Sequence, residues 1–249
     1  MSQNRDMGHP FFLPFRAARH AARLRRAELH WLSMRLFVGI PLADAVAREV
    51  GAVVERLRSG ESAGRCDGLR WTELESWHIT LQFLGNATEE QLECLKARLG
   101  KVRSEPVPVE LGDLGCFERA GVFFADVMVT PELNALERSV VAATGQCGFV
   151  AETRTFHPHI TLARMAGTKG PRDQGNKNTG SHARAEKMSR GGTLRDLLIR
   201  AGRQPAFTRF TAREFVLYES HLGPGGARYE AQMRVELGDG RDPMAGGND

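Results

Sequence analysis

The tetrapeptide His-Ile-Thr-Leu occurs twice, starting at His78 and at His159, and this repeat restricts the fold more than any other feature. Each copy lies in a strand-like run, WHITLQFLG in the first half and FHPHITLAR in the second. Composition alone gives roughly 0.4 chance occurrences of a bare His-x-Thr. Two identical tetrapeptides, one in each half, are much harder to obtain by accident. The pairing therefore predicts an internal duplication.

The segments around the repeat alternate between strand-like and helical patterns. MRLFVGIPL, from Met34, is strand-like, and apolar residues recur at helical spacing in the following ADAVAREVGAVVERLRSG. A second helix is expected at EEQLECLKARLG, where Thr88 is a candidate N-cap, and a third at PELNALERSVVAATG, which Pro131 opens. Hairpin-like strand pairs separate these helices. The pattern predicts an α+β fold with helices packed outside the sheets.

Ordered structure is expected from Met34 onward, in one domain over residues 34–238. Residues 1–33 read as a flexible basic extension, residues 168–192 as a mobile Gly- and Asn-rich insertion, and residues 239–249 as a disordered tail. The sequence leaves open whether Met1 or Met34 is the true start. It also leaves open whether the insertion follows an RNA backbone or is a solvated loop.

Charge and composition exclude several classes of protein. The net charge is only +4, and the basic excess lies in two segments: residues 1–33 hold six Arg against two acidic residues, and residues 168–204 hold nine basic against three acidic residues. This favours local contacts with a polyanion over a broad nucleic-acid-coating surface. Apolar runs are too short for a membrane span or a secretory signal. We therefore expect a cytoplasmic protein with no membrane contact.

The four cysteines are widely spaced and form no C-x-x-C pair. A zinc ribbon and a thioredoxin-like motif are therefore not predicted. We expect free, buried or half-buried thiols in a reducing compartment. The residues concerned are Cys66, Cys94, Cys116 and Cys147.

Strand geometry gives the repeat a chemical meaning. Side chains alternate along a strand, so His78 and Thr80 project from one face, and His159 and Thr161 do the same in the second copy. If the halves are related by a pseudo-twofold axis, two acid/base groups and two hydrogen-bond donors converge. One neutral imidazole can then activate water while one imidazolium protonates a leaving oxygen, which suits a phosphodiester. The alternative is that each His–Thr pair is an ordinary structural hydrogen-bonded pair. That alternative would account for a single copy, but it accounts poorly for two.

A metal site is a weaker interpretation of the same residues. Neither motif has an Asp or Glu at ligand spacing, and each strand supplies only one good ligand. His157 lies two residues before His159, on the same strand face, with Pro158 between them. We expect His157 to support the site rather than to react, and we expect no metal.

These motifs resemble the two-histidine (2H) phosphoesterases, specifically the bacterial and archaeal RNA 2′,3′-cyclic phosphodiesterases, also described as 2′-5′ RNA ligases. The resemblance runs from MRLFVGIPL through RWTELESWHITLQFLG and FHPHITLAR to LGPGGARYEAQMRVEL, omitting the insertion. It implies two pseudo-symmetric lobes whose antiparallel sheets face a central cleft, and no metal or organic cofactor. It also implies hydrolysis of an RNA terminal 2′,3′-cyclic phosphate to a 2′-phosphate, with weak reverse 2′-5′ ligation.

The resemblance also implies roles for the motif residues. His78 is the expected general acid for the leaving 3′-oxygen, and His159 is the expected general base for water. Thr80 and Thr161 are expected to hold the non-bridging phosphate oxygens. Sequence symmetry by itself leaves the acid and base roles interchangeable.

Two further residues are candidates for substrate binding. Strict alternation places Arg164 on the face opposite Thr161, but a twisted strand end would let its guanidinium bind RNA phosphate or stack on a base. A solvent-exposed arginine is the alternative. Phe37, on the first strand, is a candidate for stacking a base, although core packing is the preferred interpretation.

The sequence thus predicts a metal-independent cyclic phosphodiesterase whose partners are RNA ends or nucleotide 2′,3′-cyclic phosphates, acting as a monomer. One alternative is a nucleotide-binding module that uses the same cleft without turnover. Another keeps the chemistry but changes the substrate to a small cyclic nucleotide or an ADP-ribose cyclic phosphate.

Overall fold

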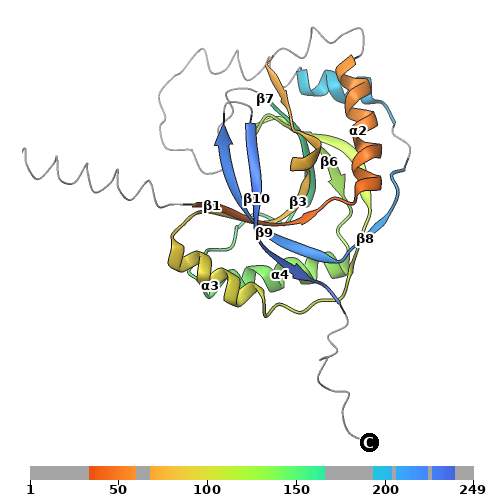
Figure 1. Ribbon diagram of the computed structural model, residues 1–249. Coiled ribbons are helices and arrows are strands. Elements are labelled where there is room, and N and C mark those ends of the chain that lie inside the picture. The colour runs from red at the N-terminus through yellow and green to blue at the C-terminus, as the bar shows by residue number, and fades with distance from the viewer. Residues whose placement is uncertain (1–33, 60–67, 166–192, 204–205, 224–225, 239–249) are drawn as a thin grey trace, which may run out of the picture. The chain divides into compact units, whose positions relative to one another are not determined.

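The computed structural model describes residues 34–59, 68–165, 193–203, 206–223 and 226–238. The predictions for residues 1–33, 168–192 and 239–249, and for Cys66, concern parts of the chain outside these ranges. The remaining domain is an α+β structure, as the sequence predicts (Figure 1).

Within these described ranges, ten strands form two sheets. An eight-stranded antiparallel sheet has the order β10-β9-β1-β3-β7-β6-β5, with β2 pairing with β7, and a second sheet pairs β4 with β8. The strands are β1 Met34–Pro41, β2 Leu69–Trp71, β3 His78–Ala87, β4 Val107–Val109, β5 Leu111–Phe117, β6 Val122–Val127, β7 His159–Met165, β8 Phe210–Ala212, β9 Glu214–Gly223 and β10 Gly226–Glu236.

The three helices that the sequence predicts are present: α2 Asp44–Ser59, α3 Glu89–Leu99 and α4 Pro131–Gly145. Thr88 caps α3 through a reciprocal hydrogen-bond pair with Gln91, and Thr130 caps α4. A short 3-10 helix covers Leu74–Ser76. The structure adds a helix at residues 193–201 that the sequence reading missed, and it lies beside α2 (Figure 1).

The main core lies between the helices and one face of the large sheet. Ile79 and Leu81 of β3 and Ile160 and Leu162 of β7 belong to the same buried cluster as the apolar residues of α2, α3 and α4. His78, which alternates with these residues on β3, is only half-buried. One face of the sheet therefore packs against the core, and the other carries the motif side chains.

The two sequence halves exchange strands within the large sheet. Strands β9 and β10, from the end of the chain, extend the sheet beyond β1, while β2, from the first half, pairs with β7 of the second. The half-sheets join where Ile79 lies opposite Ile160. Each half thus contributes to the surroundings of the other half's motif.

The prediction that all the cysteines are free thiols is wrong for two of them. Cys94 of α3 and Cys147, just after α4, form a disulfide with their Cα atoms 5.8 Å apart. The sequence separates them by 53 positions, but α3 and α4 lie together at the bottom of Figure 1, which brings the two side chains into bonding range. Among the described residues, Cys116 alone is a free thiol.

Candidate active site

The two His-x-Thr motifs lie on neighbouring strands at the centre of the sheet. Because Ile79 of β3 pairs with Ile160 of the antiparallel β7, the residues flanking this pair lie across from each other on the opposite face. His78 is thus beside Thr161, and Thr80 is beside His159. Directly opposite residues in such a ladder have Cβ atoms about 5 Å apart. The structure therefore brings the four predicted residues together on one face.

Each imidazole makes a hydrogen bond to the backbone carbonyl two residues before it. Nδ1 of His78 lies 2.8 Å from the carbonyl oxygen of Ser76, and Nδ1 of His159 lies 2.8 Å from the carbonyl oxygen of His157. A carbonyl oxygen only accepts, so Nδ1 carries the proton in each ring. In the neutral form Nε2 is then a free base, and in the charged form it is a proton donor.

Aromatic rings surround His78. The rings of Phe37 and Tyr229 lie 4.6 and 5.0 Å from it, centroid to centroid, and Tyr218 lies at 6.0 Å. Gly39 leaves space beneath the imidazole, because a Cβ there would lie 2.9 Å from the carbonyl oxygen of Ile79 and 3.3 Å from Cδ2 of His78. The ring therefore sits in an apolar setting with a fixed orientation.

Aromatic rings also surround His159, but with added polar support. Phe117 and Phe124 lie 5.1 and 5.3 Å from its ring, centroid to centroid. The neighbouring His157 places Nε2 2.9 Å from Oδ1 of Asp126. His157 thus supports this side of the site through its own carbonyl oxygen and its contact with Asp126, in the role expected from the sequence.

These surroundings favour neutral imidazoles in the unliganded protein. Burial, with smaller contributions from the charges of Arg164 and His159, lowers the pKa of His78 to about 4, and the hydrogen bond to the Ser76 carbonyl opposes this shift. Burial also lowers the pKa of His159, although the nearby Asp126 carboxylate opposes this shift. His159 therefore has a nearby negative charge that stabilises its imidazolium, and His78 has no such support.

A β-bulge in each motif changes the alternation after the threonine. On β3, Gly39 pairs with Thr80 and Val38 with Gln82, so Leu81 is the extra residue. The extra residue of β7 is Leu162.

The bulge brings Arg164 back to the motif face, whereas strict alternation predicted the opposite face. Nη2 of Arg164 lies 3.4 Å from Oγ1 of Thr161, at the long end of the hydrogen-bond range. The equivalent bulge on β3 places Phe83 on this face, where its side chain is 39% exposed and its ring lies 6.0 Å from that of Phe37. Arg164 thus reaches the site without a twisted strand end.

Phe37 is buried, which favours the packing interpretation given to it over base stacking. Its side chain is 2% exposed, but it packs beneath His78 on the motif face rather than in the main core. Its ring stacks on Tyr218 at 5.0 Å. Phe37 therefore supports the histidine, and the more exposed Phe83 beside it is better placed to meet a base.

Sequence reasoning missed most of the aromatic residues of the site. The strands β9 and β10 could be predicted from their alternating pattern, but the pairing of β9 with β1 could not. That pairing places Tyr218 opposite Phe37. The residues concerned are Phe83, Phe117, Phe124, Tyr218 and Tyr229.

The described residues contain one group with the spacing of metal ligands: Glu219, His221 and Glu230. His221 pairs with Glu230 at 3.2 Å, and Glu219 accepts a hydrogen bond from Gln232. Glu219 and Glu230 lie opposite each other on β9 and β10, next to the pair formed by Tyr229 and Ser220. Because side chains alternate along a strand, the two glutamates point to the face of the hairpin opposite that of Tyr229. This group does not contact the motif histidines.

The α+β fold and the paired motifs define a phosphoesterase of the two-histidine class. The model of the 2′-5′ RNA ligase superfamily matches residues 42–173, more than half of the chain, and the protein belongs to this family. Among the described helices, none has the length and apolarity to cross a membrane.

The chain is similar to several curated relatives named RNA 2′,3′-cyclic phosphodiesterase, of which three are described below. The protein of Archaeoglobus fulgidus is 33% identical over 135 residues, which cover 53% of this chain and 73% of the relative. The Bacillus subtilis protein is 29% identical over 133 residues, covering 51% and 69%. The Methanocaldococcus jannaschii protein is 25% identical over 200 residues, covering 79% and 97%.

Solved structures show the same fold. A crystal structure of a phosphoesterase has a TM-score of 0.60 at 22% identity, covering 83% of this chain and 99% of its own. E. coli LigT complexed with 3′-AMP has a TM-score of 0.59 at 23% identity, covering 82% and 98%.

Proposed function

We propose that this protein hydrolyses the 2′,3′-cyclic phosphate at an RNA end and leaves a 2′-phosphate. The observation that carries the proposal is the pair of imidazoles on adjacent strands, each with Nδ1 held by a carbonyl and Nε2 free to exchange a proton. The names of the relatives support the same reaction and substrate.

The reaction needs one proton acceptor and one proton donor. Nε2 of His159 takes a proton from water, whose oxygen attacks phosphorus in line with the bond to the 3′-oxygen. That bond breaks, and Nε2–H of His78 donates a proton to the departing 3′-oxygen. Hydroxyl donors on Thr80 and Thr161, together with the Arg164 guanidinium, stabilise the charge that grows on the non-bridging oxygens. Protein side chains and water supply every step.

Substrate binding favours the protonated form of His78 that the reaction needs. In the free protein, burial and the Arg164 charge hold the pKa of His78 at about 4, so this ring is mostly neutral at pH 7. An anionic phosphate between the motifs offsets the Arg164 charge and favours the imidazolium. We infer that the substrate itself raises the pKa of His78 and so provides the acid for its own cleavage.

The proposal is tested with a short RNA ending in a 2′,3′-cyclic phosphate and with 2′,3′-cyclic AMP, with products separated by chromatography. The expected product is the 2′-phosphate alone, formed in the presence of EDTA and lost in His78→Ala. Binding without any product would favour the non-catalytic nucleotide-binding module. Loss of activity with EDTA and recovery with a divalent ion would overturn the metal-free scheme.

A further inference from the structure

A second arginine lies directly opposite Arg164. Arg70 of β2 pairs with Arg164 of β7 in the antiparallel ladder, so both side chains leave the same face of the sheet. The bulge at Leu162 makes this the face of His159 and Thr161. On the other flank of Arg164, β6 contributes the apolar Val122. The face thus carries two guanidinium groups side by side.

Neither arginine has an acidic partner among the residues that the structure describes. Arg164 donates to the Thr161 hydroxyl, and its charge is felt by the Tyr229 hydroxyl and by both histidines. Arg70 is exposed. Like charges directly opposite each other destabilise a sheet, whereas other surface arginines here, such as Arg209 and Arg234, bond to glutamates. An unneutralised pair of this kind suits an anionic ligand.

The position of the pair relative to the motifs suggests which anion it binds. Arg164 reaches Thr161 and therefore the phosphate that reacts. Arg70 lies one strand farther out, about 4.8 Å away in the pairing direction, and its long side chain extends beyond the reacting phosphate. A cyclic mononucleotide has no second phosphate for Arg70, but an oligonucleotide carries a phosphodiester on the 5′ side of its terminal nucleotide.

We propose that Arg70, next to Arg164, binds the phosphodiester that precedes the terminal nucleotide, so that the protein selects RNA ends over cyclic mononucleotides. This inference rests on the proposed function and adds its substrate class. The ligand is an internal RNA phosphodiester, recognised by its charge and not by the identity of a base.

The test compares kcat/KM for 2′,3′-cyclic AMP and for the dinucleotide ApA with a terminal 2′,3′-cyclic phosphate. A third substrate is the same dinucleotide with a neutral methylphosphonate linkage. Arg70→Gln should lower the ratio of charged dinucleotide to mononucleotide about tenfold, mainly through KM, and should reduce the slope of log affinity against log salt by about 1. It should not change the ratio of neutral dinucleotide to mononucleotide. Arg70→Lys should restore part of the loss.

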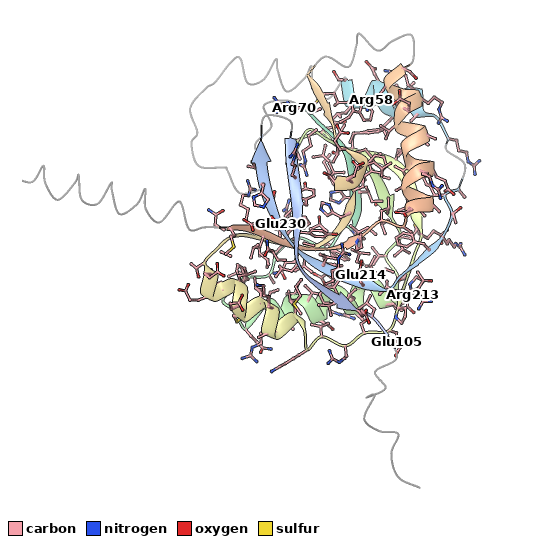
Figure 2. All side chains as sticks on the ribbon, viewed as in Figure 1. Arg58, Arg70, Glu105, Arg213, Glu214 and Glu230 are labelled. Carbon is pink, nitrogen blue, oxygen red and sulfur yellow. A yellow bond between two sulfur atoms is a disulfide. The ribbon has the colours of Figure 1, made fainter. Side chains whose placement is uncertain are left out.

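Arg213→Gln is the matched control, since Arg213 is exposed and lies far from Arg70 in Figure 2. It should leave both ratios unchanged, and circular dichroism melting should show each variant folded. Equal ratios in wild type and Arg70→Gln would overturn the subsite while leaving the hydrolase intact. If the wild-type protein hydrolysed none of the three substrates, the proposed function would fail, and the subsite with it.

Discussion

The two motif strands share one design and differ in what surrounds it. Both β3 and β7 carry a histidine held by the carbonyl two residues earlier, a threonine on the same face, and a bulge directly after that threonine. After the bulge the first strand presents Phe83 and the second presents Arg164. The shared parts position the reacting groups. We call the part of the face next to Phe83 the aromatic side and the part next to Arg164 the cationic side, although Phe117 and Phe124 also line the latter.

The surroundings of the two histidines also differ. His78 lies among Phe37, Tyr218 and Tyr229, and its pKa is lowered to about 4. His159 has the Asp126 carboxylate nearby, which favours its charged form. The two copies of the motif thus keep the same core geometry in different surroundings. This difference in surroundings is what allows two chemically identical groups to take different roles.

Removal of either imidazole should have the largest effect. His78→Ala and His159→Ala should each lower turnover of an RNA 2′,3′-cyclic phosphate by at least ~10²-fold, because each removes a proton-transfer group. His221→Ala is a suitable control, since this histidine lies on the other face of the β9–β10 hairpin. Near-normal turnover by either folded motif variant would refute the assignment.

Removal of a hydroxyl should cost less, and unequally. Thr80→Val and Thr161→Val each delete one hydrogen bond to a charged phosphate, so we expect losses of about 10- to 100-fold in kcat. The Thr161 variant should lose more, because the Thr161 hydroxyl also accepts from Arg164. Steady-state kinetics check the order. A larger loss in Thr80→Val would mean that the Arg164 contact does not serve the reaction.

The aromatic and cationic sides should respond differently to substitution. Arg164→Gln removes a charge that lowers the pKa of both histidines, so it should raise KM about tenfold and move the pH profile of kcat/KM to higher pH. Phe83→Leu should raise KM less and leave the profile in place. If both variants shifted the profile equally, the proposed division of the face would be wrong.

The disulfide behind the sheet should matter for stability and not for activity. Cys94→Ser/Cys147→Ser opens a link between residues 53 positions apart, and loop entropy predicts a loss of up to roughly 4 kcal/mol in the free energy of unfolding. Denaturant unfolding measures this loss, and kcat/KM should stay within about twofold. A tenfold loss of activity in the folded variant would show that the packing of α3 and α4 influences the geometry of the motif face.

The sequence predicted the parts of this fold that depend on local pattern. The cap at Thr88, the start of α4 at Pro131 and the alternation on the motif strands could be predicted because neighbouring residues determine them. The pairing of β9 with β1 and of β2 with β7 was not readable, because it depends on contacts between distant segments.

The same distinction holds for the site. Tyr229 and Arg70 come to the motifs only through these long-range pairings. The bulges that redirect Phe83 and Arg164 also escaped prediction, since a bulge depends on the partner strand as much as on its own sequence.

The pH dependence of kcat/KM in the wild type and the two histidine variants tests the central claim most directly. His159 must be neutral to act as base, so activity is lost as pH falls through its pKa. His78 must be protonated to act as acid, so activity is lost as pH rises through its pKa. Burial lowers both pKa values below the ordinary 6.5, which predicts a bell with both limbs on the acid side of pH 6.5. His159→Ala should lose the acidic limb, and His78→Ala the alkaline one. A flat wild-type profile, or a complete bell in both variants, would contradict the account.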